Sequence, residues 1–183
     1  MVAIVASLVA LTSASACGGG ETAGTEGATP EQWVEDVCGA VGSWMNDIEA
    51  GGTDLQQQAA NTKSIAEGRE LIVGFLDDTV TLTDRMLREV EAAGYPDIES
   101  GEDIASDFRE ELGKIRPAFV DARAKAVALP DDPEEFASGA QQIGIDMAAA
   151  GGSVGGRLEA LGDKYKSREL SETFDAASAC QGL

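Results

Sequence analysis

The sequence lacks histidine altogether and has few basic or aromatic residues. Its 183 residues include 33 acidic and 13 basic side chains, so the formal net charge is -20, and only 5% are aromatic. Without histidine there is no imidazole for acid–base catalysis near neutral pH or for binding a metal. The negative charge opposes contact with a phosphate backbone, so we expect no nucleic-acid partner. Ala, Leu, Ile and Val must form most of the core.

Motifs of catalysis and cofactor binding are missing as well. There is no G-x-S-x-G nucleophile elbow, no phosphate-binding loop and no dinucleotide fingerprint. Acid pairs such as Asp77-Asp78 are adjacent, and adjacent positions on a helix point about 100° apart, so the two carboxylates do not converge. The acidic loop at 95–103 lacks the alternating spacing of a calcium loop. We therefore expect a protein that is not an enzyme, with no cofactor and no metal site.

Residues 1–16 have the pattern of a signal peptide. Val2–Leu11 is apolar or small and uncharged, too short to span a membrane but typical of the core of a secretion signal. Small residues at 13–16 then precede Cys17. A signal normally begins with a basic segment, yet no Lys or Arg occurs before Lys63. We therefore expect the true start codon to lie upstream of Met1.

The segment Ala14-Ser15-Ala16-Cys17, followed by three glycines, resembles the processing site of bacterial lipoproteins. The resemblance implies that Cys17 receives a diacylglyceryl group, becomes the new N-terminus and anchors the protein to the outside of the cell membrane. It departs from the usual pattern because Ala14 stands where Leu is most common. An ordinary signal peptidase could also cut after Ala14-Ser15-Ala16, which would give a secreted protein. Arg outnumbers Lys, and Ala and Gly are abundant, so the whole resembles the small helical lipoproteins of actinobacteria.

The cysteine count fits this interpretation. Of the three cysteines, lipidation of Cys17 leaves Cys38 and Cys180, which are enough for one disulfide. Export brings them into an oxidising compartment, where disulfides persist. Because they lie near the two ends of the folded part, their bridge would close nearly the whole domain. The alternative is a pair of buried free thiols.

The remainder divides into a tether and a helical domain. Residues 17–29 hold the lipidated cysteine and a flexible tether rich in Gly, Thr, Ala and Glu. From residue 30 to 183, apolar residues recur at spacings of three and four, and no stretch alternates as a strand would. We predict an all-α domain, an antiparallel helical bundle of four main helices plus a short C-terminal helix.

Caps and breakers predict where these helices begin and end. The first helix should begin after Thr29 and end at Gly51-Gly52, and a long second helix should follow and end at Gly94. The third should be kinked by Pro117, because proline removes a backbone hydrogen bond. The fourth should begin at Pro133, and the short one after Ser167.

Two residue groups leave alternatives open. Trp33 and Trp44 lie eleven residues apart, on one face of the first helix, either as part of the core or as an exposed pair that contacts a partner. In the fourth helix, glycines either let a neighbouring helix pack closely or form a hinge that opens a cavity; these are Gly151, Gly152, Gly155 and Gly156.

Two functions are compatible with these features. The leading hypothesis is a non-catalytic interaction module that presents an exposed apolar patch to an envelope protein or polymer. That patch would lie around the first helix or on the distal half of the second. The alternative is a carrier of a small hydrophobic ligand, held in a cavity between the fourth and first helices.

We expect the mature protein from the membrane fraction to carry the mass of a diacylglyceryl group on Cys17. Since Cys38 and Cys180 would be bridged, two alkylations should appear only after reduction. Intact mass spectrometry before and after reduction and alkylation measures both. An unmodified chain in the culture medium would contradict the anchor and indicate ordinary secretion.

Overall fold

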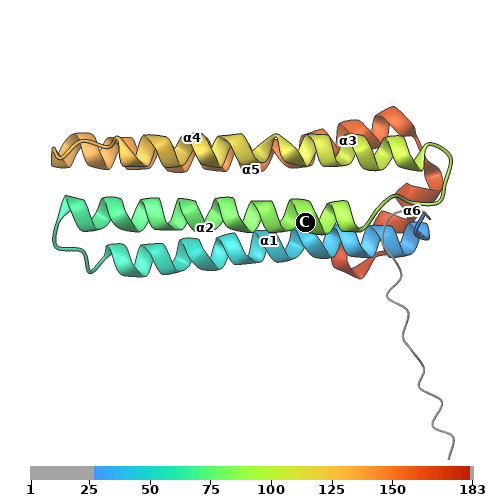
Figure 1. Ribbon diagram of the computed structural model, residues 1–183, viewed down its shortest axis with the longest axis horizontal. Coiled ribbons are helices and arrows are strands. Elements are labelled where there is room, and N and C mark those ends of the chain that lie inside the picture. The colour runs from blue at the N-terminus through green and yellow to red at the C-terminus, as the bar shows by residue number, and fades with distance from the viewer. Residues whose placement is uncertain (1–26, 182–183) are drawn as a thin grey trace, which may run out of the picture.

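The computed structural model describes residues 27–181, except for the side chains of residues 154, 155 and 157–159 (Figure 1). This part of the chain is helical and contains no β-strand, which confirms the all-α prediction. The helices are α1 (Pro30–Ala59), α2 (Ile65–Ala92), α3 (Gly101–Gly113), α4 (Ile115–Val127), α5 (Pro133–Tyr165), α6 (Arg168–Ala176) and the 3₁₀-helix η1 (Ser178–Cys180).

The helices form two layers (Figure 1). α1 and α2 run side by side in one layer, while α3 and α4 follow each other along the second layer, where α5 packs against both. α6 crosses from the second layer to α1 at one end of the molecule. Within residues 27–181, no helix combines the length and apolarity needed to cross a membrane.

Side-chain caps begin three helices where the sequence predicts them. The Thr29 hydroxyl accepts a hydrogen bond from the Gln32 backbone N–H at 3.2 Å. The Asp132 carboxylate accepts hydrogen bonds from two backbone N–H groups at the start of α5, and Ser167 accepts one at the start of α6. These caps satisfy N–H groups that lack a partner in the first helical turn.

The predicted end of the first helix at Gly51-Gly52 is wrong, because α1 continues to Ala59. A Cβ on Gly51 would lie 3.2 Å from the Phe75 ring, so the glycine lets α2 approach closely. The turn lies instead at residues 60–64, where the Ser64 hydroxyl accepts a hydrogen bond from the Glu67 backbone N–H. The Ser-x-x-Glu spacing of Ser64 and Glu67 is a capping-box signal that could have located this start.

The third predicted helix is two helices. α3 ends at Gly113 and α4 begins at Ile115, so a break at Lys114 replaces the expected kink at Pro117. Pro117 has no N–H to donate to the carbonyl group of Gly113, four residues earlier, so the hydrogen-bond ladder is interrupted there. Pro117 itself occupies the first turn of α4, where a missing N–H costs little.

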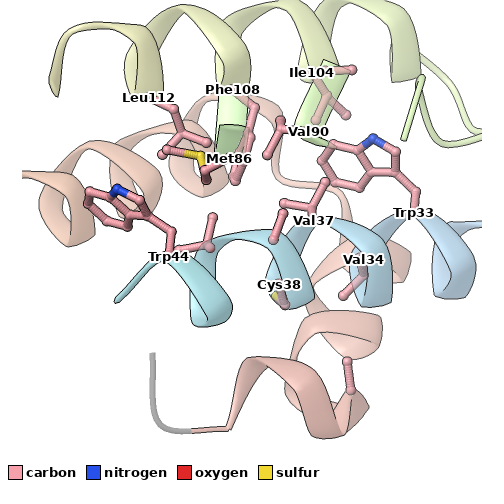
Figure 2. Packing of buried hydrophobic residues seen from close by; sticks show 14 of the residues in the cluster. Trp33, Val34, Val37, Cys38, Trp44, Met86, Val90, Ile104, Phe108 and Leu112 are labelled. Carbon is pink, nitrogen blue, oxygen red and sulfur yellow. The ribbon is translucent and has the colours of Figure 1, made fainter. Parts of the chain in front are cut away.

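The core is built around one face of α1 (Figure 2). Trp33, Val37 and Trp44 from this face pack against Val90 and Met86 of α2 and against α3. The buried hydroxyl of Thr83 accepts a hydrogen bond from the Trp44 indole N–H at 3.1 Å. A second, smaller cluster surrounds Leu76 between α2, α4 and α5.

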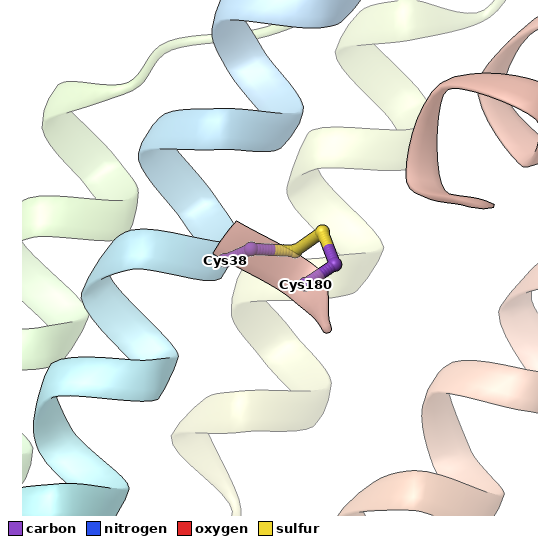
Figure 3. Close-up of a disulfide and its surroundings, with 2 residues drawn as sticks. All are labelled: Cys38 and Cys180. Atoms are coloured by element: carbon purple, nitrogen blue, oxygen red, sulfur yellow. A yellow bond between two sulfur atoms is a disulfide. The ribbon is translucent and has the colours of Figure 1, made fainter. Parts of the chain in front are cut away.

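A disulfide joins Cys38 of α1 to Cys180 of η1 across 142 residues (Figure 3), as the cysteine count predicts. Cys180 belongs to the 3₁₀-helix that follows α6, and not to the short C-terminal helix itself. In the chain-entropy model, a closed loop of this size stabilises the fold by about 5 kcal/mol.

The folded part begins slightly before residue 30. Ala28 lies between Tyr95 and Asp97, whose backbone groups exchange two hydrogen bonds of 2.8 Å with it. Residues 27–29, predicted to belong to a flexible tether, are therefore attached to the loop between α2 and α3. The predicted signal peptide at 1–16, Cys17 and the tether up to residue 26 lie outside the described residues.

We expect Gly101→Ala to destabilise the domain. A Cβ there would lie 1.9 Å from the carbonyl oxygen of Pro96, which is backbone and cannot rotate away. Overpacking of this kind costs about 1–3 kcal/mol or more, and urea unfolding monitored by circular dichroism measures it. Gly113→Ala is the control, because a Cβ there meets no atom within 4 Å. Equal stabilities of the two variants would contradict the prediction.

Candidate functional site

A large cleft separates α1 from α5. Its volume is about 1640 Å³, and its floor is formed by side chains of α3 and α4, namely Ile104, Phe108 and Phe119. α1 and α5 have almost no direct contact, although each packs firmly on other helices. The cleft, called the α1–α5 cleft below, is therefore the side of the helix assembly that is left open.

The wall on α1 contains both tryptophans. Their exposed fractions are only 1% for Trp33 and 5% for Trp44, so the hypothesis of an exposed pair is wrong and they belong to the core. Trp33 packs edge-on against Phe108 and Phe174, with ring centroids 5.7 and 6.2 Å apart. Its indole N–H donates to the Gly94 carbonyl at 3.2 Å. These contacts hold the two indoles in place beside the cleft, where a ligand would change their fluorescence.

The wall on α5 has small residues along part of its length, and Leu161 and Tyr165 nearer the end of the helix. Gly151 and Gly152 line the cleft together with Ala148 and Met147. A Cβ on Gly151, Gly152 or Gly156 would meet no atom within 4 Å, so the close-packing hypothesis is wrong at these three positions. α5 continues from Pro133 to Tyr165 and through Gly155, so these glycines do not break the helix, and a hinge at them stays a prediction.

α6 and η1 close one end of the cleft. Leu170, Phe174 and Cys180 of this segment line it, and the disulfide attaches the segment to α1. Leu170 and Phe174 have the four-residue spacing of an apolar helix face, but that spacing does not assign the segment to a site. Their role depends on where the disulfide brings α6, which spacing alone does not predict.

Polar side chains at the end of α5 fix the position of the α5 wall. Lys164 and Tyr165 of α5 both donate hydrogen bonds to the carboxylate of Asp107 in α3, with the Tyr165 oxygen 2.6 Å from it. The hydrogen bond from Lys164, and then that from Tyr165, lowers the pKa of Asp107. The hydrogen bond to Asp107 raises the pKa of both Lys164 and Tyr165. This network joins α5 to α3 and so helps to set the width of the cleft.

No group of three or more acidic, cysteine or histidine side chains in the described part of the chain is placed to hold a metal ion. Comparison with protein-family models, with curated proteins and with solved structures finds no match. The lipidation site at Cys17 lies outside the described residues and stays a prediction.

We expect Tyr165 to ionise above the ordinary tyrosine range, and Asp107→Asn to return its pKa toward that range. Because the folded-state pKa is raised, the contribution of Tyr165 to stability is present below the unfolded pKa, about 10. It is lost as the pH rises through the folded value. Absorbance at alkaline pH measures tyrosine ionisation, and Tyr165→Phe shows which part of the absorbance change comes from Tyr165. Identical titrations of the parent and Asp107→Asn would contradict the proposed hydrogen bond.

Proposed function

We propose that this chain is an exported, lipid-anchored envelope protein whose helical domain binds a small hydrophobic ligand and does not change it chemically. The single observation that carries the proposal is the α1–α5 cleft, with its volume of about 1640 Å³ and its apolar and aromatic walls. Pockets for drug-sized ligands measure roughly 300–1,000 Å³. The cleft is larger, which favours a long or branched apolar molecule.

The distribution of exposed apolar side chains favours a ligand over a protein partner. The interaction hypothesis required an apolar patch on α1 or on the distal half of α2. Among the described residues, the large exposed apolar side chains are Met45, Val120, Val127 and Ile145. Only Met45 belongs to α1, where it lines the cleft, and none belongs to α2. A patch of the required kind is therefore not found there.

We further propose that the main helices work as an antiparallel bundle, with α3 and α4 together as the third member, opened between its first and last members. The proposed anchor at Cys17 would reach the membrane through a tether that enters the fold at Ala28. Ala28 is bonded to the loop between α2 and α3, and the nearby Trp33 lines the cleft. Anchoring would therefore hold the cleft close to the outer face of the cell membrane; without lipidation, the protein would be secreted.

We expect Gly151→Leu to block the cleft and leave the fold intact. A Cβ there would meet no atom within 4 Å, and Gly151 lines the cleft, so we expect the rest of the leucine side chain to extend into it. Gly144→Leu is the matched control, because Gly144 is equally free of contacts in the same helix but does not line the cleft. Replacing a helical glycine stabilises a helix by up to about 1 kcal/mol, so both variants should melt no lower than the parent.

The probe is N-phenyl-1-naphthylamine, a neutral molecule that fluoresces when it enters an apolar site. We expect saturable binding to the parent and to Gly144→Leu, and binding at least about tenfold weaker to Gly151→Leu, a loss of about 1.4 kcal/mol. Circular dichroism during heating checks that each variant is folded. Absence of saturable binding to the parent, or equal binding to Gly151→Leu, would overturn the proposal.

A further inference from the structure

The charged side chains at the α1–α5 cleft are mostly acidic. Its lining includes four carboxylates and two basic groups: Glu49, Asp163, Glu172, Asp175, Lys166 and Arg168. Arg168 is paired with Glu172 at 2.6 Å. Among the side chains that the structure describes, no basic group forms an ion pair with Glu49, Asp163 or Asp175. Three unpaired carboxylates therefore accompany one unpaired cation, Lys166, in a chain whose net charge is already -20.

The aromatic residues of the chain are concentrated at the same cleft. The sequence has two Trp, two Tyr and five Phe, and six of these nine line the cleft: Trp33, Trp44, Phe108, Phe119, Tyr165 and Phe174. Aromatic rings attract cations through the negative potential of their faces, by about 0.5–1 kcal/mol when exposed and about 2 kcal/mol when water is excluded. Trp33, Trp44, Phe108 and Phe119 are at most 6% exposed and lie beneath the cleft surface, whereas Tyr165 and Phe174 are half-buried. Accessible aromatic rings beside carboxylates are the surroundings in which organic ammonium groups bind.

These two features deepen the proposed function, on which the following inference rests. We propose that the cleft selects a cationic amphiphile, a hydrophobic molecule that carries an amine or quaternary ammonium group. The apolar part lies between α1 and α5, and the cationic group lies beside the unpaired carboxylates. The negative charge of the protein raises the local concentration of such a ligand, whereas it opposes a carboxylate or phosphate group.

Among the described residues, the basic groups at the cleft come together at the N-terminus of α6, and this helix end does not favour an anion. Ser167 already caps this end by accepting a hydrogen bond from the Leu170 N–H, and Arg168 is paired with Glu172. Of the described basic groups at the cleft, Lys166 remains for an anionic group, and the carboxylate of Asp163, which also lines the cleft, opposes one. Charge therefore discriminates against anionic lipids of the same length.

The test compares three probes with the same twelve-carbon chain but different head groups: dodecyltrimethylammonium, dodecan-1-ol and dodecanoate. Each is titrated below its micelle concentration at pH 7.5 and low salt, with Trp fluorescence of the two cleft tryptophans as the readout. We expect the cation to bind at least about tenfold more tightly than the anion, with the alcohol between them. Because salt screens charges, high salt should reduce the difference.

The decisive variant removes the three unpaired carboxylates: Glu49→Gln, Asp163→Asn and Asp175→Asn. We expect it to bind the alcohol like the parent but to lose most of its preference for the cation. The matched control, Glu70→Gln, Asp78→Asn and Glu91→Gln, removes the same charge from exposed positions on α2, which contributes no residue to the cleft. This control variant should keep the preference for the cation, because its substitutions change only charges that lie far from the cleft.

The outcomes separate this inference from the proposed function. If the parent binds none of the three probes, the proposed function fails. If it binds the alcohol but the anion binds as tightly as the cation, the selectivity proposal fails alone. Two further results would also overturn the selectivity proposal: equal loss of preference in both triple variants, or undiminished binding of the cation to Gly151→Leu. Either would mean that the cation responds to the general surface charge and not to the cleft.

Discussion

The disulfide between Cys38 and Cys180 is the constraint on which the geometry of the cleft depends. α5 has almost no contact with α1, so the disulfide-bonded C-terminal segment is the direct connection between these two walls. α6 follows α5 after two residues, and the disulfide attaches the far end of this segment to α1. Phe174 adds an edge-on contact with Trp33. The walls are therefore joined at one end through the C-terminal segment and remain apart elsewhere.

The opening between the walls follows from the side chains of α5. Glycine and alanine at 148, 151 and 152 present little side-chain volume toward α1 along this part of α5, and Met147, Leu161 and Tyr165 line the cleft on either side of them. Each glycine within a helix costs up to about 1 kcal/mol relative to alanine, and here no close approach of another helix compensates for it. Contacts on the opposite side hold α5 in place, among them Lys125 of α4 with Asp146 at 2.6 Å. α5 is thus fixed by its outer contacts while its inner face stays open.

Local signals predicted much of this fold. The caps at Thr29, Asp132 and Ser167, and the pairing of the two distal cysteines, were readable from the sequence. The end of α1 could not be read from the sequence. Glycine destabilises a helix, but this effect is smaller than the stabilisation gained by packing where Gly51 meets Phe75. The glycines of α5 were identified, but close packing was not found at 151, 152 and 156, since their surroundings depend on which helix does not come near. Such an absence is a property of the tertiary arrangement and has no local signature.

A cleft with apolar walls would collapse if either wall could move, because closing it would remove apolar surface from water. The observed contacts oppose that movement from outside the cleft. Asp107 bonds the end of α5 to α3, the Trp33 and Trp44 indoles are hydrogen-bonded to backbone and Thr83, and the disulfide holds α6. For the proposed ligand, a site held open in this way would already be in its binding conformation. The ordering cost that lowers affinity in flexible sites is correspondingly small, so apolar contact and charge would decide which ligand binds.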